Sequence, residues 1–434
     1  MANARERLTA SESKAPKVVI VGAGFAGLEC AKALGSSAAH VTIVDRRNYH
    51  LFVPLLYQVA TAALSPADIA EPVRKVLRRH RNIEVVLGEV NGVDLASRVI
   101  TVAGGAPLPY DILILAAGSS YNYFGHPEWE AFAPGLKSIS DARQLRSRLL
   151  RGFELAERKR DPIEQRALMT SIIVGGGPTG VEMAGAIAEL ARYTLARDFR
   201  HIDPAAARTI LVEAGPRILS AFPEKLSRYA HDRLEHLGVE VICNKAVENI
   251  TAGRVRIAGE EVGVGTVIWG AGIKASPAAQ WLGVEADRIG RVKVKGDMSV
   301  EGRDGVYVIG DSAHLVDPRT GKALPGLAQV AKQQGEHLGH ALARHFESGT
   351  AIPPFSFQDR GNTAIVGRNA AVFDFGKWQL KGRLAWLLWA IVHVYLLVGF
   401  QKRLLVSIQW LWRYLTYERG ARLISWNDPA GQDP

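Results

Sequence analysis

The chain has 434 residues, and its 53 Lys and Arg against 43 Asp and Glu give a formal charge of +10. This length exceeds what one hydrophobic core usually supports, so we expect two or more domains. The only cysteines, Cys30 and Cys243, exclude a disulfide scaffold, a four-cysteine zinc site and a CxxC redox pair. They favour a cytosolic, reducing setting, and no metal site is expected. The polar first fifteen residues lack the apolar core of a secretory signal.

The positive charge is compatible with three kinds of partner: nucleic acid, an anionic membrane surface or anionic small molecules. It is equally compatible with a merely soluble basic protein. The distribution of tryptophan favours a membrane surface, because six of the nine gather towards the C-terminus. These six are Trp378, Trp386, Trp389, Trp410, Trp412 and Trp426.

The first recognisable unit is a strand, a glycine-rich turn, a helix and a second strand. Residues 17–21 (KVVIV) predict a buried strand that runs into GAGFAG at residues 22–27, followed by a helix over 28–34. In such a turn Gly22 bends the chain, Gly24 lets a pyrophosphate approach, and Gly27 lets the helix pack on the strand. Asp45 ends the next strand, 23 residues after Gly22, where it can accept hydrogen bonds from a ribose.

The same unit occurs again roughly 150 residues later. Residues 171–174 (SIIV) predict a strand that enters GGGPTG, in which Gly175, Gly177 and Gly180 take the three glycine roles. A helix is expected over 181–195 and a strand over 209–212, which ends at Glu213. A carboxylate there repels the 2′-phosphate of NADPH and so favours NADH. Glu213 lies 38 residues after Gly175, beyond the usual spacing of about 20, which predicts a lengthened helix and loop around residues 193–207.

Two dinucleotide sites in one chain indicate electron transfer between two dinucleotides, most naturally a flavin and a nicotinamide. Ala116-Ala117-Gly118 and Gly310-Asp311 each follow a predicted strand and resemble the further flavin contacts of such proteins. A plain turn at the end of a strand is the alternative for Gly310-Asp311. Other expected elements are a charged helix over 141–160 and strands at 83–86, 99–102, 112–116, 239–242, 267–269 and 306–309.

The identity of the electron acceptor is indicated by what the chain lacks. Without a cysteine pair beside the flavin, neither a disulfide nor sulfide is an expected substrate, and both cysteines are interpreted as core residues. Gln329 and Gln333 lie four residues apart and so share a helix face. That face is either simply exposed or directed at the polar head of an apolar acceptor, with the helix N-terminus near the flavin.

The C-terminal region predicts two amphipathic helices. Residues 384–400 carry no Asp, Glu, Lys or Arg, and residues 404–417 place apolar side chains three and four positions apart. Seventeen residues are at the short limit for a membrane-spanning helix. We favour two helices lying in the membrane interface, with Lys402, Arg403 and Arg413 reaching lipid head groups. A spanning anchor and an ordinary pair of core helices are the alternatives.

The sequence resembles the type II NADH dehydrogenases, which are single-subunit NADH:quinone oxidoreductases of respiratory membranes. The resemblance covers residues 17 to about 424 and rests on motifs beyond the paired glycine turns. These are NYHLF at residues 48–52, PLLYQ at 54–58, GPTGVE at 177–182, Gly310-Asp311, AQVAKQQG at 328–335, and Trp386, Trp389, His393, Gly399, Phe400 and Arg403.

The resemblance implies an α/β fold with two Rossmann-like, glutathione-reductase-like domains and a C-terminal amphipathic membrane anchor. FAD is implied at residues 16–123 with 295–350, NADH at 124–294, and the quinone side and membrane contact at 351–434. Glu182, Gln329 and Gln333 are the implied catalytic residues; a carboxylate stabilised at the helix N-terminus is the alternative for Glu182. His393 is either a quinone-side or a structural residue. The implied cofactor-binding residues are Gly22, Ala23, Gly24, Phe25, Ala26, Gly27, Asp45, Arg46, Pro54, Leu55, Val90, Ala117, Gly118, Asp311, Ala328, Gln329, Val330, Gly175, Gly177, Pro178, Thr179, Gly180, Glu182, Glu213, Ala271 and Gly272.

The predicted function is hydride transfer from NADH to FAD and two-electron reduction of ubiquinone or menaquinone, without proton pumping. The expected setting is peripheral, on the cytoplasmic face of the bacterial inner membrane, as a homodimer that binds no nucleic acid. A soluble reductase with a protein acceptor is the alternative enzyme. A nucleotide-dependent, nucleic-acid-binding sensor is the alternative outside enzymes, although no helix-turn-helix or RNA-binding signature is present.

Overall fold

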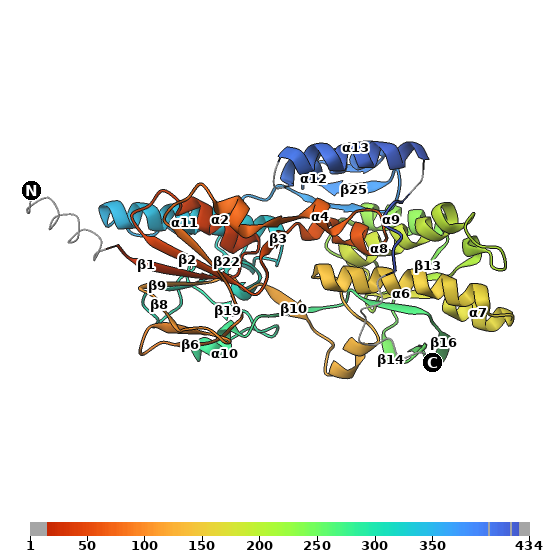
Figure 1. Cartoon of the computed structure of the whole chain (residues 1–434), viewed down its shortest axis with the longest axis horizontal. Helices are drawn as coiled ribbons and strands as arrows, with labels where there is room; N and C mark the ends of the chain where they lie inside the picture. The colour runs from red at the N-terminus through yellow and green to blue at the C-terminus, as the bar shows by residue number, and fades with distance from the viewer. Residues whose placement is uncertain (1–14, 398–399, 417–418, 425–434) are drawn as a thin grey trace, which may run out of the picture. The chain divides into compact units, whose positions relative to one another are not determined.

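The protein is described by a computed structural model over residues 15–397, 400–416 and 419–424, excluding the side chains of 400, 401 and 413 (Figure 1). The chain divides into two compact units. The first contains Met1–Leu51 as far as it is described, Glu71–Ser120 and Ile273–Gln358; the second contains Phe52–Ala70, Tyr121–Gly272 and the described part of Asp359–Pro434. Residues 52–70 therefore group with the second unit and 273–294 with the first, unlike the boundaries expected from the sequence. The assignment of cofactors to domains stays a prediction.

The first unit is built on a five-stranded parallel sheet with the order β20-β9-β1-β2-β5. Its strands are β1 (Lys17–Val21), β2 (His40–Asp45), β5 (Ile83–Leu87), β9 (Ile112–Leu115) and β20 (Val306–Val308). Helices α2 (Phe25–Ala33) and α11 (Ala328–Ser348) pack closely together. Gly335 allows this approach, because a Cβ there would lie 2.0 Å from the Ala26 carbonyl oxygen.

The remaining elements of the first unit are short. An antiparallel sheet joins three strands, β6, β7 and β8, and the strand predicted at residues 99–102 lies in its middle. The bounds of the short elements are β3 (Tyr49–Leu51), α5 (Val73–Leu77), β6 (Val90–Asp94), β7 (Val99–Val102), β8 (Leu108–Pro109), β18 (Ile273–Ala275), α10 (Ala278–Leu282), β19 (Val292–Lys293), η5 (Gly310–Ser312), β21 (Ala313–His314), β22 (Val316–Asp317) and β23 (Lys322–Ala323), with β4 (Ala70–Pro72) and β10 (Ser119–Tyr121) at the unit boundaries.

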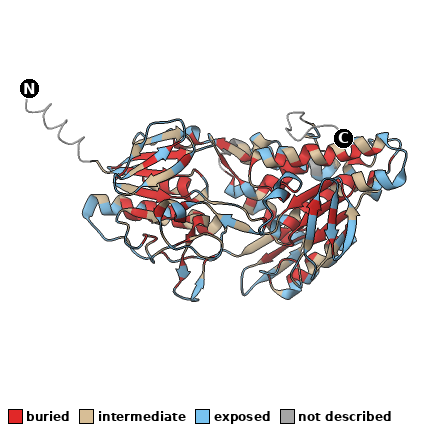
Figure 2. Cartoon of the chain, turned by 90° about the horizontal axis from the view of Figure 1, so that it is seen from below, coloured by how far each residue is buried: buried red, intermediate tan, exposed pale blue. Residues whose placement is uncertain are grey.

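The second unit repeats this plan with a four-stranded parallel sheet of order β13-β12-β11-β17. The central strands of both sheets are buried, as Figure 2 shows in red, because neighbouring strands and helices cover their apolar side chains. The elements of this unit are η1 (Val53–Leu55), α3 (Leu56–Ala60), α4 (Pro66–Ile69), η2 (Pro127–Ala131), α6 (Ile139–Arg158), α7 (Pro162–Leu168), β11 (Ser171–Val174), α8 (Pro178–Glu189), η3 (Leu190–Leu195), η4 (Pro204–Ala206), β12 (Thr209–Val212), α9 (Glu224–His236), β13 (Val239–Ile242), β14 (Val247–Thr251), β15 (Arg254–Ile257), β16 (Glu260–Gly263) and β17 (Thr266–Trp269).

Most predicted elements are present with bounds that shift by a few residues. Strands β1, β7, β11, β12 and β13 have the predicted bounds. The helix predicted over 28–34 begins earlier, at Phe25, because the glycine turn itself starts the helix. The single helix predicted over 181–195 is wrong in its last turns: α8 ends at Glu189, and Leu190–Leu195 form a π-helical turn. This turn and η4 lie in the segment expected to be lengthened.

The C-terminal part of the second unit contains a sheet that the sequence did not predict. Strands β24 (Asn362–Ile365), β25 (Ala371–Asp374) and β26 (Gln379–Gly382) form it, antiparallel throughout. Helices α12 (Arg383–Leu396) and α13 (Phe400–Thr416) follow, and α12 packs on this sheet. Within the described residues, no helix combines the length and apolarity needed to span a membrane.

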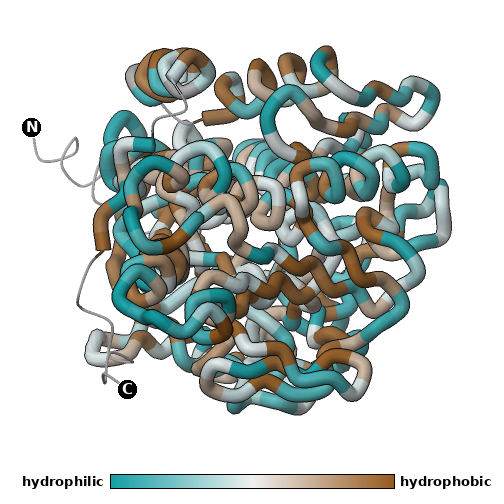
Figure 3. Tube along the Cα trace, turned by 90° about the vertical axis from the view of Figure 1, so that its right-hand side faces the viewer, coloured by the Kyte–Doolittle hydropathy of each residue, from teal (hydrophilic) through white to brown (hydrophobic). Residues whose placement is uncertain are grey.

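The helices α12 and α13 are amphipathic, and their exposed faces are the apolar ones. On α12, Ala385, Trp389 and His393 are buried four residues apart. The other face exposes Leu384, Leu387, Ile391 and Tyr395. On α13 the six apolar side chains of the predicted stripe are between 44% (Leu405) and 68% (Leu415) exposed; they are Leu404, Leu405, Ile408, Leu411, Trp412 and Leu415. In Figure 3, α13 lies at the top and carries brown residues among teal ones.

Candidate functional site: two dinucleotide turns and a buried charged cluster

The first glycine turn has the geometry that a dinucleotide requires. Gly22 has φ +104°, and a Cβ on it would meet the Ala116 carbonyl oxygen at 2.4 Å. A Cβ on Gly27 would lie 1.8 Å from the Gly22 carbonyl oxygen. The carboxylate of Asp45 accepts a hydrogen bond from the backbone N–H of Ala23 at 2.6 Å, so the end of β2 holds the turn in place. Gly22 and Gly27 are therefore each required by a specific close contact, and Asp45 by its hydrogen bond to the turn.

The second turn repeats these contacts in the second unit. Gly175 has φ +106°, and a Cβ on it would lie 2.7 Å from the Ala271 backbone nitrogen. The Glu213 carboxylate accepts the backbone N–H of Gly176 at 2.6 Å and that of Gly215 at 2.6 Å. Glu213 thus occupies the position of Asp45 despite its longer spacing in sequence. The pairing of an acid with a glycine turn, predicted twice, is present twice.

Both turns leave room and hydrogen-bond donors for phosphate groups. No described atom lies within 4 Å of a Cβ placed on Gly24 or on Gly177, which are the N-caps of α2 and α8. Because both N-caps are glycines, no N-cap side chain accepts hydrogen bonds from the first N–H groups, and N–H groups at both helix N-termini remain available to a ligand. The residues present therefore fit the pyrophosphate of a bound dinucleotide in each unit, which is compatible with the predicted FAD in the first and NADH in the second.

Asp311 lies on η5 in the first unit and accepts a hydrogen bond from the Ser119 hydroxyl at 2.8 Å. The neighbouring Gly310 donates its backbone N–H at 2.7 Å to Oε1 of Gln334, which is buried on α11. Gln334 was not among the predicted site residues, although it lies beside Gln333 in the glutamine motif. The motif therefore includes a glutamine that fixes the turn carrying Asp311.

The predicted glutamine pair has two different settings on α11. The Gln333 amide binds the backbone of Gln358 twice, donating to its carbonyl oxygen at 2.9 Å and accepting its N–H at 3.0 Å. Its hydrogen-bonding atoms are thus engaged in holding the chain after α11. Gln329 lies one turn nearer the N-terminus of the helix and is partly exposed. The two predicted glutamines therefore have different surroundings, and the role of each at an acceptor stays a prediction.

The other predicted cofactor residues are distributed over both units. Leu55 is buried in η1 beside the half-buried Pro54, Val90 begins β6, and exposed Arg46 pairs with Glu89 at 3.4 Å. The remaining residues lie in the two glycine turns, at the first turn of α11 or directly after β9 and β17; they are Phe25, Ala26, Pro178, Thr179, Ala328, Val330, Ala117, Gly118, Ala271 and Gly272. Their contacts with cofactors stay predictions.

Glu182 belongs to a cluster of titratable side chains in the second unit. It lies on α8, and desolvation by the surrounding protein raises the pKa of its carboxyl group to about 8, although a backbone hydrogen bond from Ile365 acts in the opposite direction. Glu182 is therefore largely protonated at neutral pH and can release a proton. A carboxylate that only stabilises a helix N-terminus would instead have a lowered pKa, so the alternative reading of Glu182 is not favoured.

Arg419 and Glu189 form an ion pair two turns further along α8. Their closest nitrogen and oxygen atoms are 3.7 Å apart, and both side chains are largely buried. Arg419 also donates to the backbone carbonyl oxygens of Thr61 and Ala186, at 2.8 and 3.2 Å. Burial raises the pKa of Glu189, and the pair keeps each charge from being isolated. Neither residue was predicted, since no local pattern links positions 230 residues apart.

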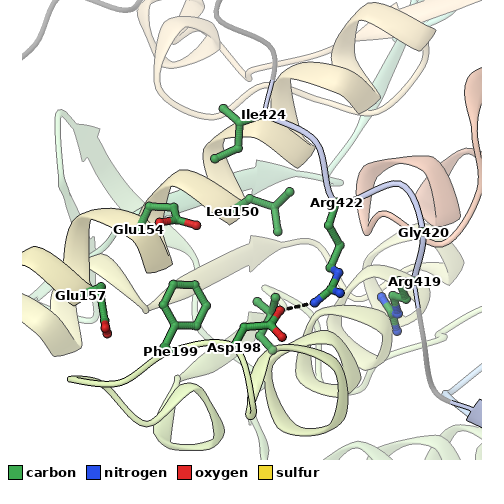
Figure 4. Close-up of a pocket in the computed structure, with 10 residues that line it drawn as sticks. Leu150, Glu154, Glu157, Asp198, Phe199, Arg419, Gly420, Arg422 and Ile424 are labelled. Carbon is green, nitrogen blue, oxygen red and sulfur yellow. Dashed lines mark hydrogen bonds and ion pairs between the residues drawn. The ribbon is translucent and has the colours of Figure 1, made fainter.

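A cavity of about 510 Å³ lies between the C-terminal segment and α6, within the second unit (Figure 4). Arg422 pairs there with Asp198, and Phe199 and Leu150 supply apolar walls. The sequence predicted no site at this place. Its acidic and basic groups are largely paired or engaged with backbone, so the cavity does not define a ligand chemistry.

The two cysteines lie in separate units. Cys30 is buried in α2, and desolvation raises the pKa of its thiol well above the usual value. Cys243 is half-buried after β13, and burial raises its thiol pKa as well. Both are free and lie in separate units, so they form no redox pair. Cys30 is a core residue as predicted, whereas Cys243 is only half-buried.

Comparison with known proteins identifies the class. The family model for pyridine nucleotide-disulphide oxidoreductases matches residues 16–335, and the model for the NDH2 C-terminal domain matches 360–417. The type II NADH:quinone oxidoreductase Ndh of Mycobacterium tuberculosis is 39% identical over 431 residues, which is 96% of this chain and 92% of the relative. The same organism's NdhA is also 39% identical and covers 94% and 89%.

Solved structures agree on the fold. NDH2 from Plasmodium falciparum in complex with NADH superposes with a TM-score of 0.86 at 21% identity, covering 95% of this chain and 100% of that one. The sulfide:quinone oxidoreductase of Aquifex aeolicus gives a TM-score of 0.71 at 17% identity, covering 90% and 92%. The fold thus defines a two-domain pyridine nucleotide-disulphide oxidoreductase. Within that class, the chain belongs to the type II NADH:quinone oxidoreductases.

Glu213 provides a test of nucleotide preference. Replacing Glu213 with glutamine removes the negative charge that repels a 2′-phosphate but keeps an oxygen that can hold one N–H of the turn. We expect the ratio of kcat/KM for NADH over NADPH to fall by roughly tenfold or more. Glu213→Ala should show the same loss of preference together with a lower Tm, because both N–H partners are lost. A wild-type protein that already prefers NADPH would contradict the assignment.

Proposed function

We propose that this protein oxidises NADH with a bound FAD and passes the electrons to a membrane quinone. The observation that carries the proposal is the pair of equivalent glycine turns, each held by a carboxylate and each with space for a pyrophosphate. The names of the curated relatives support the quinone as acceptor. A disulfide acceptor is not favoured, because the two cysteines are free and lie in separate units, where they form no redox-active pair.

In this proposal the residues of the chain bind and orient the two dinucleotides and supply protons to the quinone. Asp45 and Glu213 accept hydrogen bonds from the two ribose groups, while the N-termini of α2 and α8 face the phosphates. Bound FAD supplies the capacity to take up two electrons from a nicotinamide and give them to a quinone. Glu182, protonated at neutral pH, supplies one of the protons that quinol formation requires. Ala328, Gln329 and Val330 border the quinone.

The exposed apolar faces of α12 and α13 support attachment to a membrane surface. Monomeric soluble proteins rarely expose a contiguous stripe of this kind. Tyr395 and Trp412 on these faces are residue types that favour the membrane interface. Arg403 lies over the Tyr395 ring at 5.3 Å and donates to the Leu397 carbonyl oxygen at 2.9 Å, so it supports α12 rather than extending freely. The side chain of Arg413 and all of Trp426 lie outside the described residues.

The membrane proposal includes a peripheral location on the cytoplasmic face, without proton pumping. A homodimer and the absence of nucleic acid binding remain parts of the proposal that are supported only by the resemblance. The alternative, a reductase with a protein acceptor, would not require an apolar face of this kind. A sensor that binds nucleic acid predicts salt-sensitive DNA binding and negligible NADH turnover, which the assays below would reveal.

Charged substitutions on the exposed face of α13 test the attachment. We expect Leu411→Glu combined with Leu415→Glu to abolish co-sedimentation with vesicles of anionic phospholipid. Turnover of NADH with a short-chain, water-soluble quinone should change less than twofold, because these side chains are exposed. The matched control is Ser407→Glu, on the same helix outside the apolar stripe. Vesicle binding that survives the double substitution would contradict the proposal.

The electron transfer itself is tested by absorbance spectroscopy of the purified protein. NADH should bleach the flavin absorbance, and addition of a ubiquinone or menaquinone analogue should restore it. A protein without a flavin spectrum would contradict the cofactor, and a flavin that only a protein such as ferredoxin reoxidises would contradict the quinone. Single-turnover mixing with both substrates would also distinguish a ping-pong mechanism from a ternary complex.

A further inference from the structure

A chain of three buried or half-buried side chains connects α3 with α13 inside the second unit. The indole Nε1 of Trp410 donates to Oε1 of Gln58 at 3.0 Å. The amide Nε2 of Gln58 donates in turn to the hydroxyl oxygen of Tyr57 at 2.9 Å. Tyr57 and Gln58 are 5% and 7% exposed. None of these three residues is among the predicted site residues.

The direction of these hydrogen bonds is fixed by chemistry. An indole N–H can only donate, so the oxygen of the Gln58 amide must face Trp410. The amide nitrogen then faces Tyr57, and because it also can only donate, the Tyr57 oxygen must accept. The Tyr57 O–H is therefore left to donate to a different group. No hydrogen bond from that O–H to another described residue is present, although the carboxyl group of Glu182 lies nearby.

The surroundings keep Tyr57 protonated. Burial raises the pKa of its hydroxyl well above the usual value, and the neighbouring carboxyl of Glu182 acts in the same direction. Arg419 acts in the opposite direction but more weakly. Tyr57 is consequently a neutral hydrogen-bond donor throughout the physiological pH range, close to the carboxyl group that we assign to proton supply.

Aromatic rings line the other side of this chain of hydrogen bonds. Trp389 stacks on Trp410 with ring centroids 5.3 Å apart and on His393 at 4.2 Å. Phe52 meets His393 edge-on at 6.1 Å. Trp389 is 2% exposed, and its Nε1 has no hydrogen-bond partner among the described residues. These rings make the surroundings of the hydrogen-bonded side chains apolar, and a carbonyl oxygen of an apolar ligand would satisfy the unused Tyr57 donor.

We propose that Tyr57 is a catalytic residue that donates a hydrogen bond to a carbonyl oxygen of the quinone. Gln58 and Trp410 are positioning residues that hold the Tyr57 hydroxyl in its donating orientation. The inference rests on the proposed function, since it concerns the acceptor of that same reaction. Tyr57 keeps its proton. The hydride of NADH supplies, through the bound FAD, two electrons and one proton, and Glu182 supplies the second proton; the Tyr57 hydrogen bond stabilises the negative charge that develops on the carbonyl oxygen.

Tyr57→Phe tests the donor directly. We expect kcat/KM for a short-chain ubiquinone to fall roughly tenfold, while the rate at which NADH bleaches the flavin changes less than twofold. Quinone affinity of the oxidised protein, measured by quenching of tryptophan fluorescence, should weaken by a similar factor. Flavin content and Tm serve as controls for folding. Unchanged quinone kinetics and affinity would overturn the proposal.

Gln58→Glu tests the positioning role without removing the Tyr57 hydroxyl. An ionised carboxylate accepts from both neighbours, so Tyr57 must donate to it and is lost to the quinone. When protonated, the carboxyl group can donate to Tyr57 as the amide does, which restores the original orientation. We therefore expect quinone turnover of this variant, relative to wild type, to rise as the pH falls. Gln58→Leu should lack this rise.

Dividing the turnover of Gln58→Glu by that of the wild type at each pH isolates the titration of the new carboxyl group from that of groups present in both proteins. The charged or titratable groups on the elements packed against α3 and in the C-terminal segment are present in both proteins; those that act on Tyr57 or lie on these elements include Glu182, Glu189, Arg146, Asp68, His393 and Arg419. A ratio of turnover numbers that does not change with pH would overturn the positioning role. Failure of the proposed function would be visible separately, since wild-type reduced flavin would then not be reoxidised by quinone at all.

Discussion

Replacing Glu182 with glutamine is expected to slow quinone reduction at pH 7 by about a hundredfold and to leave FAD bound. The amide has nearly the shape of the carboxyl group but no acidic proton, and general acid catalysis is typically worth 10²- to 10⁴-fold. Wild-type quinone turnover should decline above pH 8, because the pKa of Glu182 is raised to about 8 and the group loses its proton there. The variant should lack this decline.

The same substitution has a consequence for stability whose sign follows from the raised pKa. In the unfolded chain Glu182 ionises near its ordinary pKa of 4.5, whereas in the folded protein it does so near 8. The folded state is therefore increasingly disfavoured as the pH rises through this interval. We expect the Tm of Glu182→Gln to exceed that of wild type at pH 9 and to match it near pH 5. Equal melting curves at both pH values would contradict a perturbed carboxyl group.

Glu189→Gln is the matched control for this experiment, because Glu189 lies seven residues later on the same helix. Its ion pair with Arg419 is largely buried, so removing the negative charge leaves a poorly compensated arginine. This variant should have a lower Tm at neutral pH, and its quinone turnover should still decline above pH 8 as in the wild type. The pair of variants therefore separates proton supply from the support of the fold.

Local patterns in the sequence predicted the parts of the site that lie close together along the chain. A strand, a glycine turn and an acid at the next strand's end follow one another, and each contact is short-range or between neighbouring strands. This explains why Asp45 and the first turn were placed correctly. Glu213 was predicted despite its longer spacing because strand β12 still delivers it to the turn. The extra residues form a π-helical turn and a loop outside the sheet.

Contacts over long sequence distances could not be predicted in this way. Trp410 and Gln58 lie 352 positions apart, and only tertiary packing brings them together. The tryptophan clustering predicted a membrane surface, but it gave no signal that some of these rings, such as Trp389, are buried. The glutamine motif shows a related limit. Gln333 and Gln334 are neighbours on α11, and only the side of the helix that faces the core decides which of them is buried. That choice depends on the packing of α11 against α2.

Alanine at the second glycine of each turn should separate cofactor binding from folding. A Cβ on Gly24 or Gly177 meets no described atom within 4 Å, so either variant should fold with a Tm close to that of wild type. The added methyl group would instead occupy the space through which a pyrophosphate approaches. We expect Gly24→Ala to be purified with little or no flavin, and Gly177→Ala to retain flavin but show a KM for NADH raised at least tenfold, about 1.4 kcal/mol of lost binding.

Alanine at the third glycine of each turn provides the contrast. A Cβ on Gly27 would lie 1.8 Å from the Gly22 carbonyl oxygen, and one on Gly180 would lie 1.9 Å from that of Gly175. The backbone must move in both cases, so these variants should lose stability even without any nucleotide present. Flavin absorbance per protein, thermal melting and NADH titrations distinguish the two kinds of effect. If Gly24→Ala kept its flavin while Gly177→Ala lost it, the assignment of FAD to the first unit and NADH to the second would have to be exchanged.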